Sequence, residues 1–350
     1  MRARSLLTLA LGVVVAVAVA WWLLAARATA PQSGSGKALP GLDAQLDAVD
    51  RIEVLGAGAR TLVSIVKRGG QWQMPSRQDW PANQREVTQA LFRLGQAKRL
   101  EAKTANPARH ARLGVEDIAS ELAKGSQLRL SGGPVAVQVT VGNNHPALGG
   151  SYVRIGEDPQ VWLLDSDIAP ARNPADWLDR RLLDLPMARI ERIRVAPATG
   201  RAFSLHRRDD RFSLDGLPPT AMATLDIGNA TAGFTDQLAL DDVAPDAGTA
   251  ATQTLVFESV DGLDITVAAW TQDDGTWARL SVALDPVRMD AWLVQAQADA
   301  TSDTQEAGRD ALRNQVSQWN ARFTGRQFLL PPYKVEPLLR SRDGYLAGGQ

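Results

Sequence analysis

The 350-residue chain contains no cysteine and only three histidines. Without cysteine there is no disulfide framework, no thiolate metal site, no cysteine nucleophile and no lipid attachment through sulfur. The histidines, His110, His145 and His206, are far apart in the sequence, and none is paired with a carboxylate at helical metal-ligand spacing. The sequence also lacks the Gly-x-Ser-x-Gly elbow of serine hydrolases. We therefore predict a protein without enzymatic activity, and we assign no catalytic, cofactor-binding or metal-binding residue.

The charge balance shows no excess of either sign. The chain has 38 basic and 39 acidic residues, and without Arg2, Arg4 and Arg27 near the N-terminus the remainder has 35 basic and 39 acidic residues. A nucleic-acid partner would need a basic face, so we expect none. Lysine is scarce compared with arginine, and alanine is abundant, which is typical of a GC-rich bacterial genome.

One apolar run is long enough to cross a membrane. Residues 5–26 carry no charge, and as a helix they would extend about 33 Å, compared with about 30 Å for a hydrocarbon core. Trp21 and Trp22 lie near its far end, where aromatic rings favour the interface. We predict a retained anchor in the bacterial inner membrane over residues 1–27, with a cytoplasmic N-terminus and a periplasmic C-terminal body.

A cleaved signal peptide is the alternative to this anchor. Small-x-small sites occur at Ala26–Ala28 and Ala28–Ala30, but signal h-regions are usually about 7–15 residues long, shorter than this run. Residues 28–41, rich in Pro, Gly and Ser, are predicted to form a flexible linker. Within it, residues 33–37 resemble the end of a phosphate-binding loop, but the loop's other required residues are missing, which favours the linker.

Two segments of the body repeat in the same order. Residues 49–54 match residues 190–195 at an offset of 141, and both alternate like strands. Residues 66–74 match residues 206–214 at an offset of 140, and both are typical of β-hairpins with an inward aromatic residue. We therefore predict an internal duplication.

The rest of the body predicts strands, with a helix after each hairpin. The first helix begins near Asn83, with Glu86 in capping-box position, and the second covers residues 221–234. The strand patterns then fall at residues 127–130, 135–141, 152–155, 161–164, 254–258, 263–270 and 276–283. This arrangement is typical of α+β domains with antiparallel sheets. We expect two related domains in tandem, residues 42–185 and 186–285.

Helical patterns are expected in two further places. A short helix opening at Asn173–Pro174 and carrying Trp177, Leu178, Leu182 and Leu183 is predicted to join the two domains. Residues 286–350 are predicted to form a C-terminal helical extension, with an apolar stripe at Leu312, Val316, Trp319 and Phe323. This stripe could pack on its own domain or on a partner, and we favour its own domain.

Some polar and aromatic residues could have binding or catalytic roles. The acid pairs Asp209–Asp210, Asp241–Asp242 and Asp273–Asp274 sit beside turn signals, which favours solvated turns over acid–base catalysis. The loop Asn143–His145 is a candidate for binding. Four tryptophans could form an exposed stacking surface, although core packing is the more common role of this residue: Trp80, Trp162, Trp270 and Trp277.

Three groups of motifs stand out in the body: residues 151–156 with 161–164, residues 177–183, and residues 190–195. They resemble motifs of a known bacterial family of membrane-anchored proteins with a domain of unknown function, and the likeness covers about residues 42–339. Trp72, Leu113–Asp117 (with Val115 where leucine is usual) and Gly325–Phe328 also fit this family. Its members are often encoded beside gliding-motility-type ABC transporters, and the family brings no catalytic residues.

The resemblance implies a periplasmic accessory of a transport-type complex. We therefore expect a non-enzymatic accessory or scaffold subunit whose partners are the inner membrane, through residues 5–26, and an integral membrane protein of an ABC-transporter-type complex. The alternative is a periplasmic binding module for envelope glycan or another extended ligand.

Overall fold

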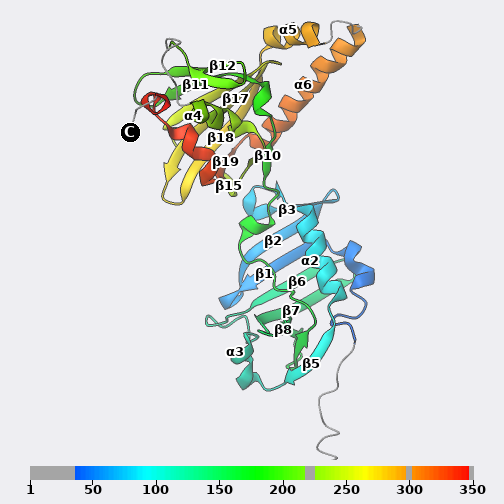
Figure 1. The fold of residues 1–350 in the computed structure, drawn as a ribbon. Coiled ribbons are helices and arrows are strands. Elements are labelled where there is room, and N and C mark those ends of the chain that lie inside the picture. Colours follow the sequence, from blue (N-terminus) through cyan, green and yellow to red (C-terminus); the bar gives the residue numbers. More distant parts are fainter. Residues whose placement is uncertain (1–35, 217–224, 297–301, 347–350) are drawn as a thin grey trace, which may run out of the picture. The chain divides into compact units, whose positions relative to one another are not determined.

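The computed structural model describes residues 36–216, 225–296 and 302–346 (Figure 1). The expected membrane anchor, residues 1–27, lies outside these ranges, as do the linker residues up to 35. Among the helices that are described, none combines the length and apolarity needed to span a membrane. The fold is α+β, with antiparallel sheets and packed helices, as the sequence predicts.

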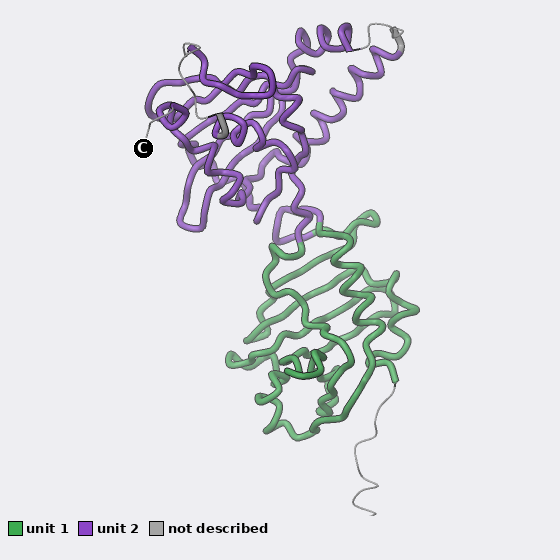
Figure 2. Tube along the Cα trace, in the orientation of Figure 1, with its two compact units in different colours: residues 1–73, 82–177 green, residues 74–81, 178–350 purple. Residues whose placement is uncertain are grey.

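The chain divides into two compact units (Figure 2). Unit 1 consists of residues 1–73 and 82–177, and unit 2 consists of residues 74–81 and 178–350. Unit 2 therefore includes residues 286–350, which the sequence analysis treated as an extension. It also includes a short segment, residues 74–81, from a much earlier part of the chain.

The sheet of unit 1 has the strand order β3-β2-β1-β6-β7-β8-β9-β5. Its strands are β1 (Arg51–Gly56), β2 (Arg60–Arg68), β3 (Gln71–Met74), β5 (Arg99–Thr104), β6 (Ser126–Gly132), β7 (Val135–Asn144), β8 (Ser151–Ile155) and β9 (Val161–Leu164). Its helices are α2 (Gln84–Gln96) and α3 (His110–Leu113), with 3-10 turns η1 (Asp43–Ala48), η2 (Ala57–Ala59), η4 (Pro107–Arg109) and η5 (Pro174–Trp177).

The larger sheet of unit 2 has the strand order β13-β12-β11-β16-β17-β18-β19-β15, and β10 pairs with β14 separately. The strands that fall in unit 2 are β4 (Trp80–Pro81), β10 (Arg181–Leu183), β11 (Ile190–Pro197), β12 (Phe203–Arg208), β13 (Arg211–Leu214), β14 (Leu238–Ala239), β15 (Asp242–Pro245), β16 (Gln253–Ser259), β17 (Leu263–Gln272), β18 (Gly275–Leu284) and β19 (Arg326–Leu330), and β4 is not part of the larger sheet. Its helices are α4 (Leu225–Ala232), α5 (Pro286–Ala296), α6 (Ser302–Phe323) and α7 (Pro332–Val335), with 3-10 turns η3 (Pro75–Arg77), η6 (Met187–Arg189), η7 (Gly233–Thr235), η8 (Glu336–Leu339) and η9 (Arg342–Tyr345).

The two large sheets share one strand order, which is what the duplication predicts. Each strand of unit 1 corresponds to the strand of unit 2 whose label is ten higher. The hairpins agree in register, because Lys67 pairs with Trp72 in unit 1 and Arg207 pairs with Phe212 in unit 2. Trp72 and Phe212 are both buried, so the two aromatic side chains have equivalent inward positions.

Helix α2 begins where the sequence predicts. The side chain of Asn83 accepts hydrogen bonds from the backbone N–H groups of Arg85 (3.1 Å) and Glu86 (3.3 Å), which caps the first turn. The N–H of Asn83 donates to the carbonyl of Trp177 at 2.7 Å. The capping box is therefore only half formed, because its second bond is made by a distant carbonyl in place of Glu86.

Two local expectations are wrong. The helix expected after Asn173–Pro174 is only the 3-10 turn η5, and Leu182 and Leu183 lie on β10, which pairs with β14. The last residues of the expected linker are packed in unit 1. The N–H of Ala38 donates to the carbonyl of Ala97 at 2.7 Å, and the side chains of Ala38 and Leu39 are buried.

Unit 2 contains a helical arm, which we define as α5 and α6. The arm connects β18 to β19, whereas the corresponding strands of unit 1, β8 and β9, are joined by residues 156–160 alone. Figure 1 shows both helices extending away from the sheet of unit 2. The amide side chain of Asn320 fixes α6 to β18 through the N–H (2.9 Å) and carbonyl (2.7 Å) of Val282.

The apolar stripe of α6 faces its own unit. Leu312 and Phe323 are buried, and Val316 and Trp319 are half-buried. The preference for packing on its own domain is therefore confirmed for these side chains.

Candidate functional site

Unit 1 contains an apolar hollow between helix α2, the sheet and the chain that follows β9. Its volume is about 80 Å³. Its lining residues are Ile52, Glu86, Ala90, Leu91, Arg93, Leu94, Leu128, Leu130, Ile168, Ala169, Pro170, Ala171, Asp176 and Trp177. An apolar hollow with a few polar groups at its edge is the usual form of a binding site, so we take it as the candidate site.

Regular elements hold the walls of the hollow in place. Ile52 on β1 and Leu130 on β6 are cross-strand partners, so their side chains lie on the same face of the sheet. Leu91 and Leu94 come from the buried face of α2. The third wall is residues 168–177, which we call the strap, and its end is fixed because the Trp177 indole N–H donates to the carbonyl of Ala171 at 3.0 Å.

The edge of the hollow carries three charged side chains. Glu86 and Arg93 lie on α2 and Asp176 lies on the strap, and all three are exposed. Within the described part of the chain, the carboxylates of Glu86 and Asp176 have no ion-pair or hydrogen-bond partner. The edge therefore presents two unpaired negative charges and one positive charge.

A polar cluster fixes the start of the strap. The Asp167 carboxylate accepts hydrogen bonds from the side chains of Asn144 (2.8 Å) and Ser151 (2.9 Å) and from the backbone N–H of Ala169 (2.9 Å). Ser151 is fully buried, and its hydroxyl oxygen accepts from the N–H of Ile168 at 3.1 Å. Asn144, a candidate binding residue in the sequence, is therefore engaged in holding the strap.

The other two residues of that candidate loop also make local contacts. The ring of His145 accepts from the backbone N–H groups of Ala147 and Leu148, each at 3.2 Å. The side-chain amide of Asn143 donates to the carbonyl of Arg112 at 3.4 Å. The polar groups of this segment at the end of β7 are therefore engaged in hydrogen bonds within the protein, those of His145 inside the loop and those of Asn143 and Asn144 with other segments.

The hydrogen bonds to Asp167 make the strap sensitive to acid. Burial raises the pKa of this carboxyl group, but the bonds from Ala169, Asn144 and Ser151 outweigh it and place the pKa below the usual value. A depressed pKa in the folded state adds stability above the unfolded-state pKa, about 3.9, and this stability is lost as the pH falls through the folded-state value.

We expect Asp167→Asn to speed amide hydrogen exchange at Ile168 and Ala169 above about pH 4, and to change it less as the pH falls below that value. The measurement is hydrogen exchange of the two variants across this range, with Asp273→Asn, in an exposed turn, as control. If amide hydrogen exchange at Ile168 and Ala169 is equal in Asp167→Asn and wild type at neutral pH, Asp167 does not stabilise the start of the strap.

The same place in unit 2 is filled. Phe257 on β16 pairs with Ile193 as Leu130 pairs with Ile52, so Phe257 occupies the position of Leu130. Its ring stacks on Phe234, with ring centroids 5.4 Å apart. The segment after β19 also contains a buried aromatic residue, Tyr345. Its hydroxyl donates to the carbonyl of Pro337 at 3.0 Å, much as Trp177 closes the strap.

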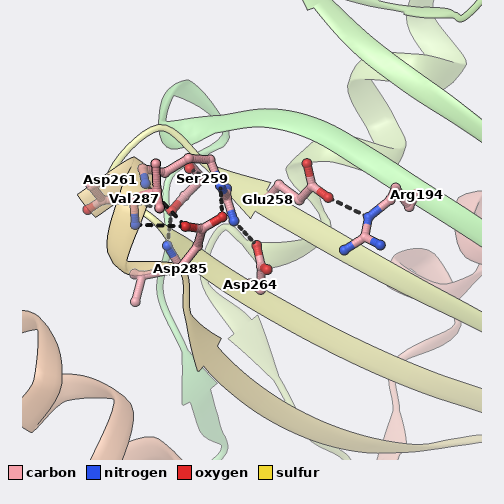
Figure 3. Close-up of polar contacts among 9 residues, drawn as sticks. Arg194, Glu258, Ser259, Asp261, Asp264, Asp285 and Val287 are labelled. Atoms are coloured by element: carbon pink, nitrogen blue, oxygen red, sulfur yellow. Dashed lines mark hydrogen bonds and ion pairs between the residues drawn. The ribbon is translucent and has the colours of Figure 1, made fainter. Parts of the chain in front are cut away.

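A dense polar cluster lies where β16, β17 and α5 meet (Figure 3). The carboxylate of Asp285 caps α5 by accepting hydrogen bonds from the backbone N–H groups of Val287 (2.9 Å) and Arg288 (3.2 Å). The guanidinium of Arg288 pairs in turn with Asp285, at 3.0 Å, and with Asp264 on β17. These contacts fix the start of the arm to the sheet of unit 2.

Ser259, in the same cluster, is not placed as a nucleophile. Its side chain is fully buried, and its hydroxyl donates to the carboxylate of Asp261 at 2.6 Å. The other oxygen of that carboxylate bonds Arg189, and the Ser259 hydroxyl also accepts from the N–H of Leu263 at 2.7 Å. A nucleophilic serine needs an adjacent base and access to a substrate, whereas these bonds hold the turn between β16 and β17.

The acid pairs lie in three different settings. Asp210, in the β12–β13 turn, is almost fully exposed, and Asp274, in the β17–β18 turn, accepts from the Trp277 indole N–H at 2.9 Å. The expectation of a solvated turn is wrong for the third pair. Asp242 forms a two-point ion pair with Arg77 (2.6 and 3.1 Å), and Asp241 pairs with Arg180.

The histidines and the four tryptophans do not gather into a site. In the described residues, no three His, Asp or Glu side chains are grouped so that they could hold a metal ion. His110 is on α3, His145 follows β7 and His206 is on β12. Of the tryptophans, Trp162 is half-buried beneath Arg99 and three are buried: Trp80, Trp270 and Trp277.

A family described as Domain of unknown function (DUF4340) matches residues 72–281, more than half of the chain. The chain belongs to this family. The DUF4340 match begins on β3 and ends on β18, so it includes α2, β6 and the strap of unit 1. No curated protein and no solved structure matches the chain.

The hollow was not predicted from the sequence. Its lining comes from β1, α2, β6 and the strap, which are distant in the sequence, and its apolar residues look like ordinary core positions. One signal was available in the sequence: the duplication places Leu130 at the position equivalent to Phe257 in the second unit. A smaller residue at an equivalent core position leaves space.

Proposed function

We propose that this DUF4340 protein is a non-enzymatic accessory or scaffold subunit of an ABC-transporter-type, gliding-motility-like envelope complex. In this proposal, residues 5–26 anchor it in the bacterial inner membrane, with the N-terminus in the cytoplasm and the body in the periplasm. Its partner is an integral membrane protein of that complex. The observation that carries the proposal is the helical arm of unit 2.

The arm is an addition to one copy of a repeated fold. Insertions in single repeats often supply a binding face, because they leave the shared core unchanged. Here the addition replaces a short turn, and the order of the strands around it is the same in both units. Its presence in unit 2 alone favours a role that the common fold does not supply.

Helix α5 is apolar on two sides. Met289 and Leu293 are buried, whereas Val287 and Val294 are 76 % and 58 % exposed and lie seven residues apart, on one face with exposed Ala291. Exposed apolar groups gathered on one helix face are typical of docking surfaces. A hydrophobic helix surface of a membrane protein is a suitable partner for this face.

An open hollow of about 430 Å³ lies beside the arm, and it is lined by Arg189, Val260, Asp261, Trp292, Leu293, Gly308, Ala311 and Leu312. The start of α5 is fixed by its Asp285 cap and by the ion pairs of Arg288, and the Asp290–Arg309 ion pair (2.8 Å) joins α5 to α6. The outer face of α5 is therefore held in a defined position for a partner.

The polar side chains favour binding over chemistry. The Ser259 cluster and the Asp241–Asp242 pair are occupied by structural hydrogen bonds and ion pairs. The glycan-binding alternative needs exposed aromatic rings, and three of the four candidate tryptophans are buried. We therefore retain the scaffold as the single proposal.

The test is co-purification of the full-length tagged protein from mild-detergent extracts of membranes. We expect Val287→Glu with Val294→Glu to reduce recovery of integral membrane partners at least fivefold, because two carboxylates would have to be buried at the docking face. The matched control is Ser317→Glu with Gln318→Glu, which adds the same charge at exposed positions of α6.

Two results would contradict the proposal. One is equal recovery of membrane proteins with the α5 variant and the α6 control. The other is retention by purified envelope glycan together with no membrane-protein partner, which would favour the binding module instead. Both variants are first compared with wild type by circular dichroism, so that loss of folding is recognised.

A further inference from the structure

The hollow of unit 1 is the size of one side chain. Its volume, about 80 Å³, is near that of an isobutyl group and well below the cavity of about 150 Å³ that encloses benzene in a protein core. In unit 2 the position of Leu130 is occupied by the larger side chain of Phe257, whose ring stacks on Phe234.

The charged residues at the edge of the hollow indicate which residue lies next to the apolar side chain that would occupy it. Glu86 and Asp176 have no side-chain partner among the described residues, and Arg93 adds one positive charge beside them. The edge therefore carries two negative charges and one positive charge, a net charge of −1. A basic residue beside the inserted side chain would complement this net negative charge.

We propose that this hollow is a socket for one branched aliphatic side chain of a partner polypeptide that carries a basic residue next to it. The socket is on unit 1 and is independent of the arm of unit 2. Anchors of this kind dominate binding when they fill a pocket and exclude water from it. The surrounding strap and helix α2 supply the rim.

The probes are three peptides, Ac-Lys-Leu-Lys-NH2, Ac-Glu-Leu-Glu-NH2 and Ac-Lys-Ala-Lys-NH2, added to the full-length protein in detergent. Binding is measured by ligand-observed NMR. We expect the first peptide to bind in the millimolar range, which is normal for so small a ligand, and each of the others to bind at least tenfold more weakly. Stronger binding of the glutamate peptide would overturn the charge argument.

Variants of α2 test the position of the site. Ala90 is half-buried and lines the hollow, so the Ala90→Leu side chain should fill it and lower the affinity for the lysine–leucine peptide at least tenfold. Gln89 is exposed and outside the hollow, so Gln89→Leu should leave this affinity unchanged. Glu86→Gln with Asp176→Asn should abolish or reverse the preference for the lysine peptide over the glutamate peptide, because Arg93 is then the charge that remains at the edge. Equal binding by Ala90→Leu and wild type would overturn the proposal.

Two further results separate this proposal from others. If Ala90→Leu changes the mass measured by sedimentation, the occupant is a second copy of this chain, and the proposed partner is wrong. The α5 double variant should bind the lysine–leucine peptide as wild type does. Failure of the socket and failure of the scaffold proposal are therefore distinguishable.

Discussion

Replacing Trp80 by alanine is expected to lower the free energy of unfolding of unit 2 by about 3–5 kcal/mol, the range for a large aromatic side chain removed from a core. Trp80 is 1 % exposed, its ring meets Phe328 edge-on at 5.4 Å, and its indole N–H donates to the carbonyl of Asp179 at 2.8 Å. The guanidinium of Arg322 also lies 4.8 Å from the ring centroid. The measurement is hydrogen exchange of β19 amides with increasing denaturant.

The control is Trp162→Ala. This ring is half-buried in unit 1 and is covered by Arg99 at 4.8 Å, so its loss should leave the exchange of β19 unchanged. Trp80→Phe should lower the free energy of unfolding of unit 2 by less than Trp80→Ala does. The ring contact is kept and mainly the hydrogen bond is lost, which is worth about 1 kcal/mol. Unchanged protection of β19 in Trp80→Ala would contradict the central place given to this residue.

The importance of Trp80 shows where domain prediction from sequence fails. Residues 74–81 leave the first hairpin and belong to unit 2, where Arg77 pairs with Asp242 and Trp80 packs on Phe328. A boundary drawn along the sequence cannot assign such a segment, since nothing local distinguishes it from its neighbours. A fragment starting at residue 186 would lack both side chains.

Regular patterns were predicted well. The alternation in residues 49–54 and 190–195 predicted β1 and β11, and the hairpin aromatics Trp72 and Phe212 are buried as expected. These elements depend on local periodicity, which the sequence carries directly. The short strands β5, β10, β14 and β15 were missed because pairing with distant partners decides them, as with Leu182 on β10.

The candidate site was harder to predict for the same reason. The absence of cysteine and the scattered histidines leave no metal-binding motif in the sequence, and no short motif describes a space between Leu130, Leu94 and the strap. Only the comparison of two copies reveals it. Asn144 illustrates the opposite problem, because a polar loop residue that suggested binding is used to hold Asp167.

Gly228→Ala is expected to destabilise unit 2 by about 1–3 kcal/mol, the usual cost of overpacking, although the same change in an exposed helix stabilises it by about 1 kcal/mol. Gly228 is buried on α4, and a Cβ atom there would lie 2.1 Å from the carbonyl oxygen of Phe212. The side chain of the next residue, Asn229, accepts a hydrogen bond from the N–H of Phe212 at 2.9 Å. Helix α4 therefore approaches β13 too closely for a side chain at position 228.

The matched control is Gly233→Ala in η7, where a Cβ atom would meet nothing within 4 Å. This change should be neutral or stabilise by about 0.4–1 kcal/mol, because it restricts the unfolded chain. Both variants are compared by chemical denaturation. The opposite signs are the decisive feature, since a general intolerance of alanine would lower the stability of both. Stabilisation by Gly228→Ala would show that α4 can move away from Phe212, and that the contact does not fix the helix on the sheet.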